Sequence, residues 1–245
     1  MRERRFLIPR SQWREGRAYL GPDEIHHARR VLRLRSGDKV TVVDGEGGAF
    51  YGLLAEDADG APFCGELHPL AATGEPRDCI TLAPALAKGD KLDVICEKAV
   101  ECGVFALRPI ITAHCEPTPR AFANLRPRLE KIIQSALQQS GRARLPLLHD
   151  PVPLPALPLA DYDAILILHP EGNPPALNDA ARAVAPGRDA KILILCGPEG
   201  GFSPEEIAAL TTQGAKPCGL GPRILRTETA GPLAVFTALA ARGNL

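Results

Sequence analysis

The chain has 245 residues, of which 45% are hydrophobic and 24% are charged, proportions typical of a folded globular protein and not of a disordered one. Its formal net charge is zero, and no apolar run approaches the roughly 18 residues of a membrane-spanning helix. The start, MRERRFLIPR, lacks the apolar stretch of a signal peptide, and the cysteines show neither CxxC pairs nor zinc-like Cys/His spacing. We therefore expect a cytoplasmic protein with reduced thiols and no metal site.

The neutral total hides an uneven distribution of charge. Residues 1–39 contain 11 Lys or Arg against five acids, whereas residues 40–75 contain seven acids and no Lys or Arg. A second basic run, 120–144, contains six Lys or Arg against Glu130 alone. Two basic zones favour contact with a polyanion, although a run of charge is more often a solvated face.

Residues 1–72 have the pattern of a small β-rich domain with one helix. Apolar residues at helical spacing between Pro22 and Gly37 predict the helix. The strand-like runs KVTVVD and AFYGLLAE, joined by GEGG, predict a hairpin. The segment 67–78 is rich in Pro, Gly and Thr, and we expect it to link this domain to a second one, 76–245.

The second domain alternates continuous apolar runs with helical periodicity. The runs ITLAPAL, VFALRPII, AILILHP, KILILCG and AKPCGLG predict strands, and KGDKLDVICEKAVECG and LRPRLEKIIQSALQQSG predict amphipathic helices. Continuous apolar strands between helices are typical of a buried parallel sheet, so the fold class is α/β. The proline-rich stretch 150–163 is expected to be a connector within this domain.

Ligands of open α/β sheets bind at the carboxyl ends of the strands, and three such ends are distinctive. They are ILILHPEGN, ILILCGPEGGFSPEE and LGPRILRTETAGP. The segment SPEE has the residues of a helix start, but that pattern does not account for Glu199 between proline and two glycines. Because neither GxxxxGK[ST] nor GxGxxG is present, the loop suits a ligand without phosphate, such as an adenosyl group carrying a sulfonium. We expect the last helix to begin at Gly231-Pro232.

These motifs resemble a known family. CGPEGGFSPEE and LGPRILRTETA, together with KGDKLDVICEKAVECGV and QQSGRARLP, are similar to the RsmE family of SPOUT-class methyltransferases, which methylate N3 of a uridine in small-subunit (16S) ribosomal RNA. RRFLIP, HHARRVLRLRSGD and VVDGEGGAFYG resemble the family's PUA-like RNA-binding domain. The resemblance implies a trefoil knot in the second domain, S-adenosylmethionine as methyl donor, and a homodimer. The chain departs from the family pattern at Glu97-Lys98, at His114 in place of an arginine, and at Leu129 in place of an aromatic residue.

By this resemblance, the strand-end loops bind the cofactor. The expected cofactor-binding residues are Leu168, His169, Leu195, Cys196, Gly197, Pro198, Glu199, Gly200, Gly201, Leu220, Gly221, Ile224, Leu225 and Thr227. Uridine N3 carries a proton, so the enzyme must help to remove it. We expect Arg226 to stabilise the developing negative charge, and Glu228 or Glu199 to accept the proton or orient Arg226. Alternatively, Arg226 and Glu228 form an ion pair that braces the fold, and Thr227 and Thr229 are turn residues.

The target base must leave its stack, so the protein must also hold the flanking RNA. We expect Arg5, Arg30, Arg33 and Arg142 to contact RNA phosphates, with Arg30 and Arg33 on one helical face. Each of these arginines could equally be a solvated surface charge, and Arg142 follows a helix end, where a cation complements the helix dipole.

Two other functions remain open from the sequence. One is a related methyltransferase that modifies a ribose 2′-hydroxyl or guanine N1. The other is a non-catalytic RNA-binding assembly factor with a vestigial adenosyl pocket. Cys196 as a nucleophile is a weaker option, because it lies in an apolar run and has no evident His/Asp relay.

Overall fold

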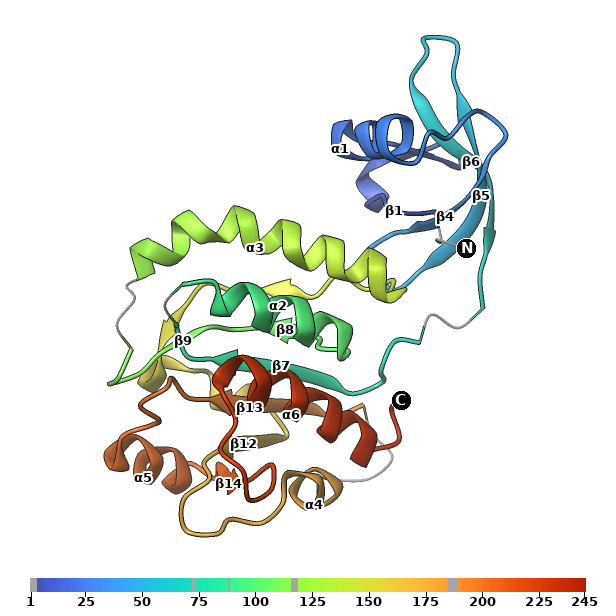
Figure 1. Ribbon diagram of the computed structural model, residues 1–245. Coiled ribbons are helices and arrows are strands. Elements are labelled where there is room, and N and C mark those ends of the chain that lie inside the picture. Colours follow the sequence, from blue (N-terminus) through green and yellow to red (C-terminus); the bar gives the residue numbers. More distant parts are fainter. Residues whose placement is uncertain (1–3, 72–73, 88, 116–118, 185–188) are drawn as a thin grey trace. The chain divides into compact units, whose positions relative to one another are not determined.

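The computed structural model describes residues 4–71, 74–87, 89–115, 119–184 and 189–245. The chain forms two compact units (Figure 1). The first comprises residues 1–75 together with 137–145, and the second comprises residues 76–136 and 146–245. The short segment 137–145 therefore belongs with the first unit, although the sequence placed it in the second domain. Residues 72–73 of the expected linker lie outside the described part of the chain. No helix in the described ranges is long and apolar enough to cross a membrane.

In the described residues, the first unit contains a six-stranded sheet of order β1-β4-β5-β6-β3-β2. Its strands are β1 (Arg5–Leu7), β2 (Trp13–Arg14), β3 (Arg17–Tyr19), β4 (Lys39–Val43), β5 (Ala49–Glu56) and β6 (Pro62–Pro69), and a 3₁₀ turn, η1 (Arg10–Gln12), precedes β2. The predicted hairpin is confirmed, since β4 pairs antiparallel with β5 from Lys39↔Leu53 to Val43↔Ala49. Strand β6 was not predicted from the sequence.

The helix of the first unit is shorter than predicted. Helix α1 (Pro22–His26) continues as a π-helical turn, η2 (His27–Val31). The helix ends there, and Arg33 adopts a left-handed backbone with φ 54°. An L-residue with that φ cannot continue a right-handed helix, which explains why the predicted extension toward Gly37 does not form.

The described part of the second unit contains a parallel sheet of order β10-β8-β7-β13-β12-β14. Its strands are β7 (Cys79–Pro84), β8 (Ala106–Leu107), β10 (Leu147–Leu148), β12 (Ala164–Leu168), β13 (Lys191–Cys196) and β14 (Lys216–Cys218). The α/β class and the buried central strands are confirmed. The run VFALRPII, predicted as one strand, divides at Arg108-Pro109 into β8 and β9 (Ile110–Ile111), since proline donates no ladder hydrogen bond. Strand β9 pairs with β11 (Val152–Pro153), which lies in the predicted connector with the 3₁₀ turns η3 (Leu154–Ala156) and η4 (Leu159–Asp161).

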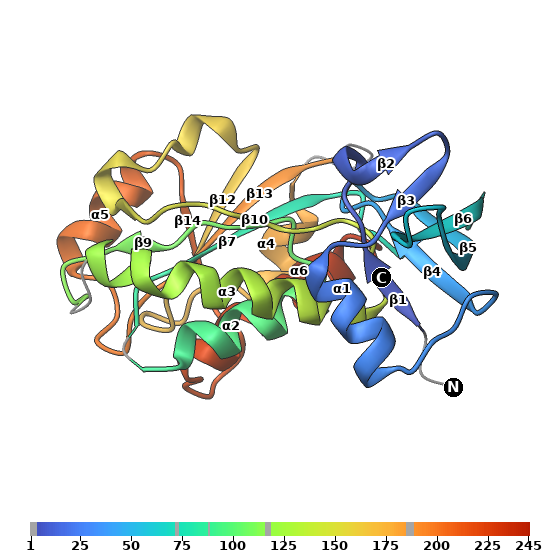
Figure 2. The same ribbon diagram turned by 90° about the horizontal axis from the view of Figure 1, so that it is seen from above.

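Helices cover both faces of this sheet. They are α2 (Lys91–Glu101), α3 (Pro119–Ser140), α4 (Leu177–Arg182), α5 (Pro204–Thr212) and α6 (Thr227–Ala241). Figure 2 shows α5 on one face of the strands and α2 and α6 on the other. Side chains on β13 alternate accordingly: Leu193 and Leu195 join the core cluster that includes Leu210 of α5. On the opposite face, α6 packs so closely that a Cβ at Gly231 would lie 3.2 Å from Cδ2 of Leu82.

The last helix begins earlier than the sequence indicated. Helix α6 starts at Thr227 with Arg226 as its N-cap, and the amides of Thr229 and Ala230 donate to the Arg226 carbonyl. The expected start at Gly231-Pro232 is therefore wrong, because the proline lies inside the helix. Proline lacks an N–H, so its place in the helix leaves the Glu228 carbonyl without the usual donor four residues ahead. Thr227, Glu228 and Thr229 therefore lie in the first turn of the helix and do not precede it.

Candidate active site

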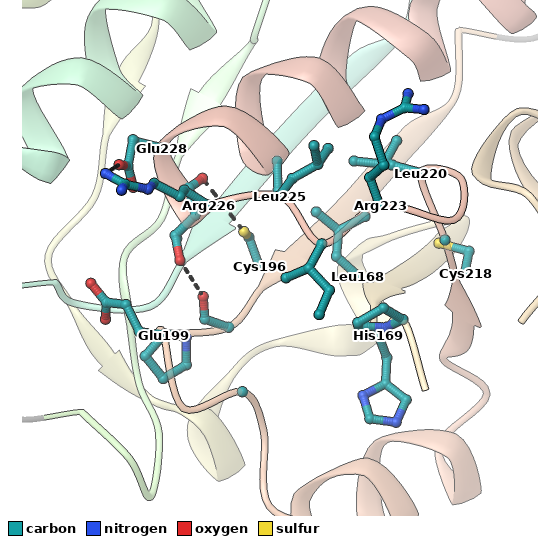
Figure 3. Close-up of a pocket in the computed structure, with 18 of the residues that line it drawn as sticks. Leu168, His169, Cys196, Glu199, Cys218, Leu220, Arg223, Leu225, Arg226 and Glu228 are labelled. Carbon is teal, nitrogen blue, oxygen red and sulfur yellow. Dashed lines mark hydrogen bonds and ion pairs between the residues drawn. The ribbon is translucent and has the colours of Figure 1, made fainter. Parts of the chain in front are cut away.

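A cavity of about 390 Å³ lies where β12, β13 and β14 end (Figure 3). Its volume is within the range of about 300–1,000 Å³ typical of small-molecule sites. All but two of the expected cofactor-binding residues line it, namely Leu168, His169, Cys196, Gly197, Pro198, Glu199, Gly201, Leu220, Gly221, Ile224, Leu225 and Thr227. The three strand ends that the sequence singled out therefore meet at one place.

Leu195 and Gly200 are the two that do not line the cavity. Leu195 is fully buried in the core cluster on the α5 face of the sheet. Gly200 faces His114, since a Cβ at this glycine would lie 3.3 Å from the His114 Cβ. The imidazole Nδ1 of His114 is also 3.1 Å from the Gly201 carbonyl oxygen. His114 thus supports the glycine loop from outside the cavity.

The glycine loop is joined to the start of α6 by Thr227. The Thr227 hydroxyl donates to the Gly197 carbonyl oxygen at 3.3 Å, and the side chain is almost fully buried. The Cys196 thiol lies 3.9 Å from the Thr227 carbonyl oxygen. Two contacts therefore connect Thr227 to the end of β13 and the residue after it. On the far side of the loop, Ser203 and Glu206 form a capping box that fixes the start of α5. The loop is therefore held at both ends.

Charged side chains lie around the cavity in two ion pairs. Glu199 is paired with Lys91, the first residue of α2. Arg226 Nη1 lies 3.9 Å from Glu228 Oε1. Figure 3 shows Glu199, Arg226 and Glu228 gathered on one side of the cavity and Arg223 on the other. The three residues proposed for catalysis from the sequence are thus close together, and their roles stay predictions.

Several lining residues were not foreseen, namely Lys91, Pro170, Cys218, Gly219, Arg223 and Ala230. Five of these lie within the runs ILILHPEGN, AKPCGLG and LGPRILRTETAGP that the sequence singled out, but they were not chosen as lining residues. Lys91 is different, because it comes from a helix over a hundred residues before Glu199. No spacing rule in the sequence connects the two.

Comparison with known proteins identifies the family. Residues 74–239 match the family described as "RNA methyltransferase domain", and residues 20–56 match "RNA methyltransferase PUA domain". Ribosomal RNA small subunit methyltransferase E of Bacillus subtilis is 31% identical over 232 residues, covering 91% of this chain and 89% of the relative. The chain belongs to the RsmE family. The resemblance seen in the sequence is thereby confirmed, and the second unit contains an RNA methyltransferase domain.

Solved structures agree with this RsmE assignment. A putative methyltransferase from Legionella pneumophila, in complex with S-adenosylmethionine, aligns with TM-score 0.81 and 31% identity over 98% of this chain and 96% of its own. A ribosomal RNA small subunit methyltransferase E from Neisseria gonorrhoeae, bound to S-adenosylmethionine, aligns with TM-score 0.79 and 29% identity over 95% of both chains. The likeness extends over both units.

The four arginines expected to bind RNA occupy different environments in this RsmE chain. Arg142 is 6% exposed and lies 2.7 Å from Glu75, which also accepts hydrogen bonds from the amides of Ala143 and Arg144. Arg5 donates to the carbonyl oxygens of Gly141 and Arg142. These contacts tie Arg5 and Arg142 into the first unit, and for Arg142 they exclude the solvated surface charge that the sequence offered as the alternative.

Arg30 and Arg33 are exposed, which agrees with a phosphate-binding role. They do not share a helical face, however, because the helix ends at Val31 and Arg33 has a left-handed backbone. That part of the expectation is wrong. Their contact with RNA stays a prediction.

The two thiols that line the cavity of this RsmE chain are not placed for chemistry. Burial raises the pKa of the Cys196 thiol to about 12, and it does the same for Cys218, which also lines the cavity. A thiol with such a pKa is protonated at neutral pH and is a poor nucleophile. Among the described residues, no group of three or more His, Cys, Asp or Glu side chains is arranged to hold a metal ion.

Proposed function

We propose that this chain transfers a methyl group from S-adenosylmethionine to N3 of a uridine in 16S ribosomal RNA. The observation that carries the proposal is the cavity at the ends of β12, β13 and β14, bounded by the CGPEGG and LGPRILRTET segments. Two full-length structural neighbours are described as bound to S-adenosylmethionine. The curated relatives are named for the small-subunit ribosomal RNA. The trefoil knot implied by the resemblance stays a prediction.

The cavity has the chemistry that an adenosyl sulfonium requires. Its walls are largely apolar at Leu168, Leu220, Ile224 and Leu225, which suits the two faces of an adenine ring. Within the described part of the chain, the backbone groups of Leu220, Gly221 and Leu225 form no hydrogen bonds with other backbone groups, so these amides and carbonyls can read the edge of the ring. The carboxylates of Glu199 and Glu228 also lie in the lining, each beside a cation, Lys91 and Arg226 respectively.

S-adenosylmethionine, when bound, supplies an electrophilic methyl group. The chain's own contribution begins with alignment, because an in-line displacement needs the uracil N3 held against that methyl group. Arg226 is 87% exposed in its side chain and lies on the cavity rim, where its guanidinium can pair with a uracil oxygen or an adjacent phosphate. As N3 loses its proton, negative charge spreads to O2 and O4, and the guanidinium stabilises it.

Glu228 is better placed than Glu199 to accept the N3 proton. Its side chain is 20% exposed and faces Arg226, so its carboxylate lies beside the group that holds the base. Glu199 is instead paired with the Lys91 ammonium of α2 and not with Arg226. We therefore assign proton removal to Glu228, charge stabilisation to Arg226, and support of the glycine loop to the Lys91–Glu199 pair.

The proposal includes a homodimer that acts in the cytoplasm, where ribosomal subunits are assembled. Helices α2 and α6 pack against each other, and they leave apolar side chains exposed at Val94, Leu233 and Phe236. Ile224, on the cavity rim, is 90% exposed. Burial of these side chains against a second copy of the chain would remove apolar surface from water close to the active site.

In vitro methylation tests the proposed function. Small subunits from a strain lacking the modification, and naked 16S RNA, are incubated with the protein and S-adenosylmethionine, and the RNA is digested for nucleoside analysis by mass spectrometry. We expect 3-methyluridine. A 2′-O-methyl nucleoside or 1-methylguanosine would instead identify the related enzyme class, and calorimetry without any heat on addition of S-adenosylmethionine would support the non-catalytic factor.

A further inference from the structure

The sheet of the first unit has two chemically different faces. On one, Val40, Val42, Leu54 and Cys64 form a core cluster with Ala28 and Leu34 from the helix and the residues after it. Side chains alternate along a strand, so the neighbours of these residues point to the other face. That second face carries basic and aromatic side chains that the proposed function has not used.

Strands β4, β5 and β6 place a first group on this second face. Tyr51 and His68 are cross-strand partners, and their rings are stacked with centroids 6.0 Å apart and planes at 19°. The Lys39 ammonium lies 5.7 Å from the Tyr51 ring centroid. His68 and Lys39 are exposed, and Tyr51 is half-buried. The group therefore presents two ring systems and a cation within one cluster.

Strands β3 and β6 place a second group further along the same face, since Phe63 lies five residues before His68 on β6. Tyr19 and Phe63 are cross-strand partners with ring centroids 5.6 Å apart. The Arg17 guanidinium lies 4.8 Å from the Phe63 ring centroid, and that of Arg14 lies 5.9 Å from the Tyr19 ring centroid. We call the two groups together the aromatic face, defined by Lys39, Tyr51, His68, Arg17, Tyr19 and Phe63. Two of the chain's three tyrosines are on it.

The cations of the aromatic face contact aromatic rings, whereas several other cations of the same unit are paired with acids. Elsewhere, acids neutralise arginines in the pairs Arg4–Asp38, Arg10–Asp44 and Arg29–Glu56. Within the described ranges, neither Lys39 nor Arg17 forms an ion pair, and their close partners are rings. A cation held over a ring keeps its charge available to a polyanion.

We propose that the aromatic face binds unpaired nucleotides of the RNA substrate, with bases stacked on the Tyr51–His68 group and on the Arg17 guanidinium and with phosphates held by Lys39. The proposal rests on the proposed function only in taking RNA as the substrate. Rings and planar guanidinium groups stack on bases that have left a helix, whereas a duplex hides its base faces. The basic residues at Arg30 and Arg33 have no such rings beside them in the described structure, so they suit phosphate contact alone.

The test compares binding of the full chain to two oligoribonucleotides of equal length. One is a single-stranded segment around the target uridine, and the other has a run of abasic residues in the flank with the phosphates intact. Tyr51→Leu keeps apolar bulk but removes the ring, and we expect it to weaken binding of the intact oligonucleotide about tenfold, as for loss of one stacked base. On the abasic oligonucleotide, wild type and Tyr51→Leu should bind equally.

Three variants control the experiment. Tyr51→Phe retains the ring and should bind like wild type. Lys39→Gln should reduce the slope of log K against log salt by about 0.7, the value for one phosphate contact on a single strand. Arg29→Gln also removes one positive charge, but from the pair with Glu56 on the helix side, and it should leave the discrimination between the two oligonucleotides unchanged. Thermal unfolding checks that each variant is folded. If Tyr51→Leu does not fold, His68→Ala is used in its place, because it removes the other ring of the stacked pair.

The inference is overturned if Tyr51→Leu binds the intact oligonucleotide as tightly as wild type, or loses the same factor on both oligonucleotides. Preference of the wild type for a duplex of the same sequence would also overturn it. Nucleoside analysis separates this result from the proposed function. If wild type forms 3-methyluridine while Tyr51→Leu binds normally, the aromatic face alone is refuted. If wild type binds as expected but forms no 3-methyluridine, the reaction is refuted.

Discussion

Arg226 and Glu228 lie 3.9 Å apart at the start of α6, but their side chains differ sharply in exposure, 87% against 20%. An ion pair that braces a fold is buried on both sides, and an exposed one contributes only about 0–1 kcal/mol. The pair therefore has little to do with stability. Its geometry instead leaves the guanidinium free to turn toward a ligand while the carboxylate stays in place.

Arg226→Ala is expected to lower kcat for RNA methylation by about 10²–10³-fold, the usual effect of removing one donor from a developing anion. The melting temperature and the affinity for S-adenosylmethionine should stay near those of wild type, because the side chain is exposed. Arg226→Lys retains the charge without the planar fork and should recover only part of the rate. Activity of Arg226→Ala within a few-fold of wild type would contradict the catalytic role.

Glu228 and Glu199 are distinguished by matched substitutions. Glu228→Gln should lower kcat by about 10²–10⁴-fold at neutral pH, the range for loss of a general base. Its activity should recover as pH rises, since hydroxide can then remove the N3 proton. Glu199→Gln should retain most of kcat, because the Lys91 ammonium already holds that carboxylate. The reverse order of effects would move the proton acceptor to Glu199.

Gly201 tests the glycine loop against a control in the same unit. Its φ of 70° is left-handed, so Gly201→Ala should cost about 1–2 kcal/mol of stability and also distort the cavity lining. Gly214, with φ 89°, follows α5 and does not line the cavity. Gly214→Ala should cost a similar amount of stability and leave S-adenosylmethionine binding unchanged by calorimetry. Equal effects of both variants on binding would show that the loop matters only for folding.

The dimer prediction concerns the apolar side chains left exposed on α2 and α6. Phe236 is 46% exposed, and Phe236→Glu should convert the protein to a monomer in size-exclusion chromatography with light scattering. Val31 is 59% exposed in the first unit, so Val31→Glu makes the same change at an unrelated place and should leave the dimer intact. A wild-type monomer, or a dimer that persists in Phe236→Glu, would contradict this interface.

The sequence predicted the parts of this structure that depend on local pattern. Continuous apolar runs gave the central strands, because a strand buried on both faces needs apolar side chains at every position. The ends of elements were less predictable. Arg33 ends its helix through a left-handed backbone, and α6 begins four residues before Gly231 because the Arg226 carbonyl accepts from Thr229 and Ala230. Neither the left-handed backbone of Arg33 nor the hydrogen bonds to the Arg226 carbonyl can be read from the types of residue present.

In the site, too, the features with a local sequence signal were predicted and those that depend on tertiary packing were missed. Its loops were found because glycines after apolar strands are a local signal, and the strand order then brings them together. Lys91 was missed because its contact with Glu199 depends on the tertiary fold, which brings the start of α2 to the loop after β13. Arg142 was expected on the surface because its neighbours are basic, but a single distant acid, Glu75, makes it part of the interior.

The Glu75–Arg142 pair should make stability depend on pH. Burial raises the pKa of Glu75, but the Arg142 guanidinium and the amides of Ala143 and Arg144 lower it more, so the folded value is below the ordinary 4.5. A carboxyl with a depressed folded pKa contributes stability above its unfolded pKa and loses it as pH falls through the folded value. Glu75→Gln should therefore cost about 3–5 kcal/mol at pH 7, as for a broken buried pair, and progressively less below pH 4.5.

Urea unfolding at pH 7 and pH 3 measures both values. Glu130→Gln provides the matched control, because Glu130 pairs with Arg126 on the surface, where loss of a pair changes stability by less than about 1 kcal/mol. Arg142→Gln should destabilise as strongly as Glu75→Gln, and the double variant should cost less than the sum, since neither partner is then left buried alone. An Arg142→Gln variant of normal stability but weakened RNA binding would instead restore the phosphate-binding role expected from the sequence.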